Sequence, residues 1–230
     1  MRLKNYFFDP IYLTRTRLRM GLVDAIYPLL DPSIKCLDVG CGDRPYESLF
    51  FQGSYLGIDV LTSGRSEELK KPDLYYDGVT IPFNDNSFDI VMSSQVLEHV
   101  NSPVELLREM GRVLKDDGSL IISIPFVYPV HELPFDYLRF TEFGIADMLI
   151  KSGFKAETIK KDSSTIETIA VLLNVYIVNN LMPKIRGIHY VYNALLCFPI
   201  QVIAVCLSKL LPDKGFLYLN LIVSAKKVVI

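Results

Sequence analysis

Residues 33–45, SIKCLDVGCGDRP, place a short apolar run directly before two glycines that are separated by one residue. The run is typical of a buried strand, and Gly40 and Gly42 allow a tight turn that a ligand can approach closely. Pro45 stands where a first helical position is expected, which predicts a short helix over 46–50. A strand, a glycine turn and a helix in this order are typical of ligand-binding α/β sheets.

The same alternation of apolar runs and helical stretches continues outward to residue 124. Its clearest helix covers residues 102–115, because Ser102 precedes a proline, Glu105 follows three residues later and apolar side chains share one face. The alternation predicts a doubly wound, mostly parallel sheet with helices on both faces. Strands of this sheet are predicted at 33–39, 55–60, 73–78, 88–94 and 119–125.

Residues after 125 complete the predicted sheet. A long loop leads to a helix over 141–152 that ends before Gly153, and further strands are predicted at 154–161 and 216–227. We expect four segments in the chain. They are a basic helical N-terminus (1–32), a ligand-binding core (33–164), an apolar helical insertion (165–212) and the last strand (213–230).

Two charge-free stretches fall inside the predicted insertion. Residues 168–183 and 187–208 contain no Lys, Arg, Asp or Glu, and the second is long enough to span a bilayer. Asn174 and Gln201 interrupt them, and such groups are unfavourable in hydrocarbon. We favour, in this order, a helical pair that covers the domain or lies in a membrane surface, a homodimer contact, and a membrane span.

The first 20 residues carry a local excess of positive charge. Five basic residues face a single Asp9, which gives a local charge of +4 that would attract an anionic leaflet. Arginines interrupt the apolar residues of this segment, so we expect no secretory signal and a cytoplasmic protein. The basic residues are Arg2, Lys4, Arg15, Arg17 and Arg19.

The whole-chain composition argues against several classes of protein. Lys plus Arg is 24 and Asp plus Glu is 26, so a net charge of −2 provides no basic field for nucleic acid. Four scattered cysteines form neither a disulfide framework nor a zinc-finger pattern. No group of histidines and carboxylates has the spacing of a metal site, so we expect no metal ion.

Asp38 gives the glycine turn its chemical character. It lies two residues before Gly40, and Pro45 occupies the place of the third glycine in a dinucleotide fingerprint. A carboxylate beside the turn would repel a pyrophosphate and attract an ammonium group. The turn therefore favours a ligand with a positive charge.

Further carboxylates follow the next two strands. Asp59 comes 17 residues after Gly42, close to the spacing at which an acid accepts hydrogen bonds from ribose hydroxyls. Asp77 can accept from an exocyclic adenine amine, and Gly78 leaves its backbone N–H open to a ring nitrogen. A cationic amino acid joined to adenosine would satisfy all three positions.

The chain resembles the class I S-adenosylmethionine-dependent methyltransferases, in particular the methyltransferase type 11 group. The resemblance covers about residues 34–154. It rests on LDVGCG (37–42), GIDV (57–60), IPFNDNSFDIV (81–91), LEHV (97–100), RVLKDDGSLIISIP (112–125) and GF (153–154).

The resemblance implies a seven-stranded sheet and S-adenosylmethionine as the cofactor. One departure is visible, because the third glycine of the family's first motif is missing and Arg44 and Pro45 lie nearby. By the resemblance, Gly40 and Gly42 pass under the methionine part and Asp38 holds its amino group; Asp59 binds the ribose, Asp77 and Gly78 the adenine, and Ser94 or Gln95 lies beside the sulfonium.

Residues 131–141, HELPFDYLRFT, follow a predicted strand and so lie at the same edge of the sheet. His131 is the candidate general base, because imidazole titrates near neutrality and an acceptor hydroxyl must lose a proton. His99 competes for this role, although it can equally pack a helix start. Asp136 and Arg139 are candidates for holding the acceptor, or they form a structural pair that fixes the loop.

The sequence thus predicts an enzyme that methylates an oxygen of a small molecule or glycan. The loop at 131–141 resembles type 11 members associated with bacterial surface-polysaccharide and glycolipid synthesis, which suggests a lipid-linked glycan. Two alternatives stay open, a catalytically silent scaffold that binds a partner through residues 165–212 and a nicotinamide-dependent oxidoreductase.

Overall fold

The computed structural model describes residues 9–183, 185 and 187–228 of the 230-residue chain. The described residues form two compact units. One contains a seven-stranded sheet and is built from residues 21–160 and 221–228, and the other is helical and is built from residues 9–20 and 161–220. The boundary near the N-terminus falls inside helix α1 (Tyr12–Ile26), between Met20 and Gly21.

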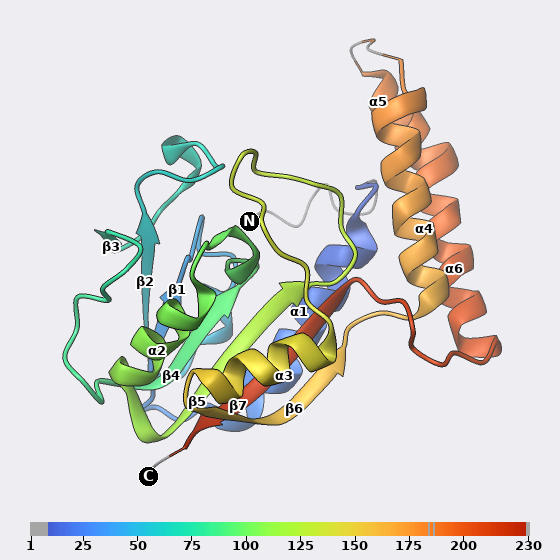
Figure 1. The fold of residues 1–230 in the computed structure, drawn as a ribbon. Helices are drawn as coiled ribbons and strands as arrows, with labels where there is room; N and C mark the ends of the chain where they lie inside the picture. Colours follow the sequence, from blue (N-terminus) through green and yellow to red (C-terminus); the bar gives the residue numbers. More distant parts are fainter. Residues whose placement is uncertain (1–8, 184, 186, 229–230) are drawn as a thin grey trace. The chain divides into compact units, whose positions relative to one another are not determined.

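The strands form one sheet in the order β3-β2-β1-β4-β5-β7-β6, which confirms the predicted mostly parallel, seven-stranded α/β fold (Figure 1). The pairs β1–β2, β1–β4, β2–β3 and β4–β5 are all parallel. The strands are β1 (Lys35–Val39), β2 (Ser54–Val60), β3 (Leu74–Tyr76), β4 (Phe88–Ser94), β5 (Leu114–Pro125), β6 (Phe154–Lys161) and β7 (Asn220–Lys227).

Strand β7 is the antiparallel member of the sheet and runs against its neighbours β5 and β6 (Figure 1). At one end of the β6–β7 hairpin Val228 N donates to Gly153 O, and at the other Asp162 N donates to Asn220 O. The start of β6 is thus bonded to the end of β7, and the end of β6 to the start of β7, which makes the pair antiparallel.

The helices that cover the sheet begin and end close to the predicted residues. Helix α2 (Pro103–Val113) starts with a proline at its first position, and β5 begins directly after it at Leu114, so the predicted helix over 102–115 is slightly too long. In helix α3 (Glu142–Lys151), the Thr141 hydroxyl accepts from Gly144 N at 3.0 Å. The helix predicted over 46–50 is a single 3₁₀ turn, η3 (Glu47–Leu49).

The central strands carry the core of the sheet unit. Leu37 in β1, Val91 in β4 and Ile121 in β5 are fully buried, as expected for parallel strands covered on both faces. Leu107 and Met110 bury the inner face of α2. Because β1, β2, β4 and β5 are parallel, their carboxyl ends and the loops that follow meet at one edge of the sheet.

The helical unit consists of two long antiparallel runs and the start of α1. The first run is α4 (Thr165–Tyr176), which continues through the π turn η6 (Ile177–Leu181). The second is α5 (Ile188–Tyr192), the π turn η7 (Asn193–Cys197) and α6 (Phe198–Leu210). A capping box between Ser164 and Glu167 fixes the start of α4.

The polar residues of this unit point inward. Asn174 is fully buried and its amide donates to Pro10 O and Cys197 O at 3.1 and 3.0 Å. Gln201 is buried as well, and its amide oxygen accepts from Leu13 N at 2.9 Å. These contacts remove both amide side chains from the outer surface of the helices.

Two of the basic residues counted near the N-terminus are not available as free charges. Arg15 pairs with Asp9 at 2.9 Å, and Arg17 pairs with Glu167 of α4. Arg2 and Lys4, which contribute to the predicted charge of +4, lie outside the described residues. Asp9 is already included in the predicted charge of +4, so only the contact of Arg17 with Glu167 lowers the local positive charge below that count.

Candidate active site

A cavity of about 410 Å³ opens at the edge of the sheet where the parallel strands end. Its lining combines the glycine turn after β1, the end of β2, residues 94–96 after β4, and residues 131, 132 and 135 of the loop after β5. The predicted cofactor residues and the predicted acceptor-side histidines, His99 and His131, thus line the same cavity.

The glycine turn leaves room for a ligand only because it has no side chains. Gly40 has φ +79°, and a Cβ at this position would lie 2.4 Å from Cγ2 of Val96. Gly42 has φ +53° and donates its N–H to Asp59 Oδ2 at 2.8 Å. L-residues adopt such φ values at a cost in energy, so both glycines are required by the backbone.

Asp38 is almost completely buried beneath the turn. Its Oδ2 accepts from the Tyr55 hydroxyl at 2.5 Å, whereas its Oδ1 has no hydrogen-bond partner among the described residues. Burial raises the pKa of Asp38 to about 7, and the Tyr55 hydrogen bond works in the opposite direction. A buried carboxylate oxygen without a donor is unfavourable, so this atom requires a ligand that supplies an N–H or a positive charge.

Asp59 lies at the end of β2 and is held in place from several sides. Its Oδ2 accepts from Gly42 N and its Oδ1 from Val60 N at 2.7 Å, and Lys70 Nζ is 3.5 Å from Oδ1. A carboxylate has about four acceptor positions, so Asp59 can still accept from ligand hydroxyls. Lys70 is itself buried and donates to Val60 O at 2.6 Å, which fixes its ammonium group beside the carboxylate.

Arg44 occupies the place of the missing third glycine and adopts the same left-handed backbone, with φ +61°. Its guanidinium contacts Asp73 at 2.6 Å and Glu47 at 2.9 Å, and it lies 5.1 Å from the centre of the Tyr55 ring. These contacts compensate for a φ value that a non-glycine residue adopts with strain. The turn therefore keeps its geometry without the glycine.

The predicted adenine-binding residues divide into two groups. Gly78 lines the cavity, as do Ser94 and Gln95 at the end of β4. Asp77 is outside the lining, and its Oδ1 accepts from Val79 N and Thr80 N at 2.8 Å each. Asp77 Oδ1 therefore stabilises its own turn, and the predicted contact of Asp77 with an adenine amine stays a prediction.

Asp136 and Arg139 form a structural pair outside the cavity lining. Arg139 contacts both carboxylate oxygens of Asp136, at 2.5 and 2.8 Å, and donates to Tyr128 O. Arg139 holds the pKa of Asp136 well below its usual range. Both side chains fix the loop around His131, whose backbone N–H donates to Asp136 Oδ2, which agrees with the structural alternative. A role of the pair in holding the acceptor stays a prediction.

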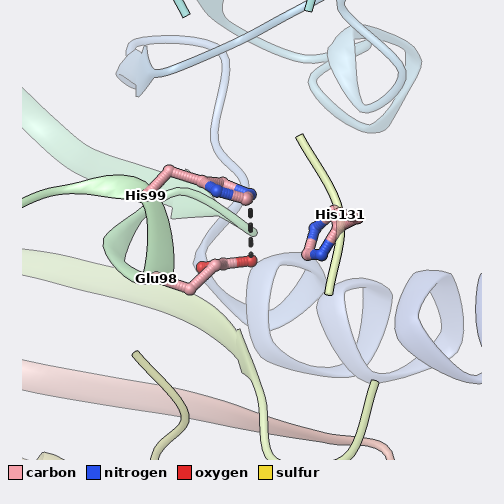
Figure 2. Close-up of side chains that lie close together, drawn as sticks. All are labelled: Glu98, His99 and His131. Atoms are coloured by element: carbon pink, nitrogen blue, oxygen red, sulfur yellow. Dashed lines mark ion pairs between the residues drawn. The ribbon is translucent and has the colours of Figure 1, made fainter. Parts of the chain in front are cut away.

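Glu98, His99 and His131 come together beside the cavity, which His99 and His131 line and Glu98 does not (Figure 2). One potential ligand atom from each lies within 4.8 Å of the others. The rings of His99 and His131 meet edge to face, with centroids 4.7 Å apart. Burial raises the pKa of the Glu98 carboxyl to about 8. The expectation that no metal-ligating group forms was based on spacing along the chain, which does not reveal this cluster.

Sequence reasoning also missed other polar residues of the site. Tyr55, Lys70 and Glu132 lie within a strand or in loops, at positions that no motif marks. Only the parallel pairing of β1 with β2 brings Tyr55 next to Asp38. A lysine inside a polar loop is an ordinary surface residue by composition, so nothing in the sequence indicates that Lys70 is buried.

Residues 37–122 match the family described as "Methyltransferase domain". The matched region contains the first four parallel strands, the glycine turn, Asp38, Asp59, Glu98 and His99. This match confirms the resemblance to class I S-adenosylmethionine-dependent methyltransferases that the sequence motifs indicate.

A curated relative is the demethylmenaquinone methyltransferase of Renibacterium salmoninarum. It is 33% identical over 120 residues, which cover 46% of this chain and 47% of the relative. The chain spans less than half the length of the first curated relatives that it matches, 39% and 47%. Their names therefore describe proteins that this chain matches only in part.

Solved structures confirm the fold. The cyclase SpnF superposes with a TM-score of 0.60 at 20% identity, over 92% of this chain and 82% of that chain. The 1,6-didemethyltoxoflavin-N1-methyltransferase of Burkholderia thailandensis, with S-adenosylhomocysteine bound, gives a TM-score of 0.56 at 14% identity, over 93% and 79%. A cyclase and a methyltransferase share this fold, so function has to be argued from the site.

Proposed function

We propose that this chain, whose residues 37–122 carry the signature of a class I methyltransferase domain, binds S-adenosylmethionine and methylates an oxygen of a small-molecule or glycan acceptor. The observation that carries the proposal is the Oδ1 atom of Asp38. It is buried, belongs to a residue that lines the cavity and has no hydrogen-bond partner among the described residues. An ammonium group is the donor that best satisfies a buried carboxylate.

The residues around the cavity fit the parts of this cofactor. Gly40 and Gly42 provide a backbone surface for its amino-acid part, and Asp38 receives the ammonium group. Asp59, held by the N–H of Gly42 and by Lys70, presents its carboxylate to the ribose hydroxyls. S-Adenosylmethionine supplies a methyl group on a positively charged sulfur, which leaves as a neutral thioether.

The charge distribution argues against a nicotinamide dinucleotide. Asp38 lies directly beneath the glycine turn, where a pyrophosphate would bind in a dinucleotide fold. Lys70 does not offset this charge, because its ammonium group already contacts Val60 O, Leu61 O and Asp59. The oxidoreductase alternative is therefore disfavoured by the site.

In this proposal the two histidines act on the acceptor, since both line the same cavity as Asp38 and Gly40. His131 Nδ1 is 3.2 Å from both Asp136 Oδ2 and Pro129 O, which orients the ring and reserves Nε2 for the cavity side. A ring held in this way is suited to receive the proton of an acceptor hydroxyl. Positioning of the two reactants contributes most of the rate, because the leaving group is already activated.

The finer proposal is that the acceptor is a sugar or a lipid-linked glycan of bacterial surface-polysaccharide synthesis. Mass spectrometry of surface glycans and lipids from cells with and without the gene tests it. We expect one glycan species to lose the mass of one CH₂ group when the gene is deleted and to regain it on complementation. An unchanged glycan profile together with a shifted lipid or small-molecule species would contradict the glycan assignment.

We further propose that the helical unit binds a membrane surface. Helix residues 188–210 are long and apolar enough to cross a bilayer by length and composition, and only 22% of the most apolar window is buried within the chain. The polar Asn174 and Gln201 are inside the unit, whereas large apolar residues point outward. Such an arrangement suits a hydrocarbon environment. The exposed apolar residues include Ile169, Leu173, Leu181, Leu195, Ile203, Leu207 and Leu210.

Liposome flotation with charge-bearing variants tests this location. The double variant Leu195→Glu/Ile203→Glu places two carboxylates on exposed positions, so the fold should persist, and each loses about 1.5–3 kcal/mol of burial in the bilayer. We expect the natural chain to float with vesicles and the double variant to stay in the soluble fraction. Phe143→Glu, at an exposed apolar residue of α3 in the sheet unit, is the matched control and should float. Equal partition of all three proteins would refute the proposal.

A further inference from the structure

Two imidazole rings and a carboxylate converge beside the cavity (Figure 2). Their contacts are the edge-to-face packing of the two rings and a 3.9 Å approach of His99 Nε2 to Glu98 Oε1, which is too long for a hydrogen bond. Glu98 and His99 come from the 3₁₀ turn η5 (Leu97–His99), whereas His131 comes from the loop after β5. His131 is 32 residues after His99 in the sequence, yet one ligand atom of each of the three residues lies within 4.8 Å of the others.

His99 presents a lone pair to two carboxylates. Its Nδ1 is 2.7 Å from Phe135 O, and since a carbonyl can only accept, the Nδ1–H must donate. In a neutral ring this leaves the lone pair on Nε2, which is 3.9 Å from Glu98 Oε1 and 4.0 Å from Glu132 Oε2. Three electron-rich groups that face one another require a proton or a cation between them.

Glu98 provides a second and independent indication of a ligand. Its side chain is fully buried, and neither carboxylate oxygen has a hydrogen-bond partner among the described residues. Figure 2 shows the carboxylate directed toward His99 and His131. A buried carboxylate is stable when it is paired or when it coordinates a metal.

We infer that Glu98, His99 and His131 bind a divalent transition-metal ion. Two imidazole nitrogens and one carboxylate oxygen are a common ligand set for Zn²⁺ and Fe²⁺, and they leave further positions open for an exogenous ligand. The Nδ1–H of His99 donates to Phe135 O, and Nδ1 of His131 lies 3.2 Å from both Pro129 O and Asp136 Oδ2. Histidines that bind a metal typically donate their second ring N–H to such an acceptor.

The present distances call for a small contraction on binding. Bonds of about 2.0–2.2 Å place tetrahedral ligand atoms roughly 3.3–3.6 Å apart. The three ligand atoms here all lie within 4.8 Å of one another, so they would have to approach by roughly 1 Å. Glu132, whose Oε2 faces His99, is available as a fourth ligand.

This inference deepens the proposed function, on which its catalytic meaning rests. A bound ion would polarise an acceptor hydroxyl and lower its pKa, so that the proton passes to solvent and the oxygen is the nucleophile. His131 would then act as a metal ligand instead of a base. The acceptor would be an oxygen compound that can reach an open metal position.

The experiment measures metal binding directly, without activity. We expect chelator-treated full-length protein to bind one Zn²⁺ in a calorimetric titration, and Co²⁺ to give the visible absorption of a low-symmetry site. Glu98→Gln and His99→Ala should each weaken Zn²⁺ binding by roughly 10- to 100-fold or more. His189→Ala, which removes an exposed histidine of α5, is the control and should bind as the natural chain does.

Glu98→Gln also separates the metal site from a structural carboxylic acid. If Glu98 were only a buried neutral acid, the isosteric amide would leave the protein equally able to bind Zn²⁺, and that result would overturn the inference. So would Zn²⁺ binding that persists in His99→Ala at full affinity. S-Adenosylhomocysteine titrated into the chelator-treated protein distinguishes the two proposals. If the protein binds S-adenosylhomocysteine but not Zn²⁺, only the metal site is refuted. If it binds Zn²⁺ but not S-adenosylhomocysteine, only the proposed function is refuted.

Discussion

Asp38→Asn is expected to weaken the binding of S-adenosylhomocysteine about a hundredfold at pH 7.5, because a charge-assisted hydrogen bond is lost in a buried site. The fold should not suffer. The variant removes a buried carboxylate with one unpaired oxygen, so the free energy of unfolding of the ligand-free protein should rise by roughly 1–3 kcal/mol. Calorimetry and thermal denaturation measure the two effects on the same sample.

The pH dependence of this binding follows from the pKa of Asp38, which is about 7 in the ligand-free protein. Only the ionised carboxylate attracts the ammonium group, so affinity should rise about tenfold per pH unit below pH 7 and level off above it. The affinity of Asp38→Asn should not vary in this range. Three groups that face Asp38 also act on the pKa of this carboxyl. The hydrogen bond from Tyr55 and the charge of Arg44 lower the pKa of Asp38, and the charge of Asp59 raises it.

The same pKa makes the stability of the ligand-free protein depend on pH. The folded state has a raised pKa, so it binds more protons than the unfolded chain between about pH 4 and pH 7. This contribution to stability is present at low pH and is lost as pH rises through 7. The advantage of Asp38→Asn should therefore grow from pH 4 to pH 7.

Tyr55→Phe is the matched variant for this account. It keeps the ring that packs against Phe50 and removes the hydroxyl that donates to Asp38. The pKa of Asp38 should then rise further, and the ascending part of the affinity profile should move to higher pH. A profile that is the same in the natural chain, Tyr55→Phe and Asp38→Asn would show that Asp38 does not contact the ligand.

Gly40→Ala is the second substitution with a large expected effect. The new Cβ would lie 2.4 Å from Cγ2 of Val96, and the backbone is at φ +79°. We expect a loss of about 2–4 kcal/mol in the free energy of unfolding, from left-handed strain and steric overlap together. Affinity for S-adenosylhomocysteine should also fall at least about tenfold, because the turn must shift away from Val96. Chemical denaturation and calorimetry provide the two readouts.

Two companion variants separate strain from overlap. Gly153→Ala has nearly the same φ, +82°, but nothing within 4 Å of its Cβ, so it should lose only about 1 kcal/mol and bind normally. Adding Val96→Ala to Gly40→Ala removes the overlap and should restore part of the stability. If Gly153→Ala impaired binding as strongly as Gly40→Ala, the effect would be a general one of stability and not of the turn.

The parts of the site that the sequence predicts lie in the last residues of strands or directly after them. Asp38, Gly40 and Asp59 occupy fixed places relative to β1 and β2, and parallel pairing brings the ends of these strands together. The number of strands came from family resemblance, whereas the strand order and the antiparallel direction of β7 were not predicted, because periodicity alone does not determine strand pairing. For Asp136 and Arg139 the sequence left two roles open, acceptor binding and a structural pair, and the structure brings the two side chains into contact at 2.5 Å.

Residues that depend on contacts between loops were beyond the reach of sequence patterns. Glu98 and His131 meet because the loop after β5 folds back on η5, where Tyr137 N donates to Glu98 O. Lys70 is buried by its contacts with the end of β2. In the apolar insertion, the inward direction of Asn174 and Gln201 follows from contacts with the start of α1, which no local signal specifies.

The central claim is that the cavity beneath the glycine turn receives a positively charged sulfur nucleoside. The most direct test is a calorimetric titration of the purified chain with S-adenosylmethionine, S-adenosylhomocysteine and NAD⁺ at pH 7.5. The account predicts one binding site for each of the two sulfur compounds, no detectable heat with NAD⁺, and binding of S-adenosylhomocysteine that is about a hundredfold weaker in Asp38→Asn. Absence of binding for both sulfur compounds, or tighter binding of NAD⁺, would contradict it.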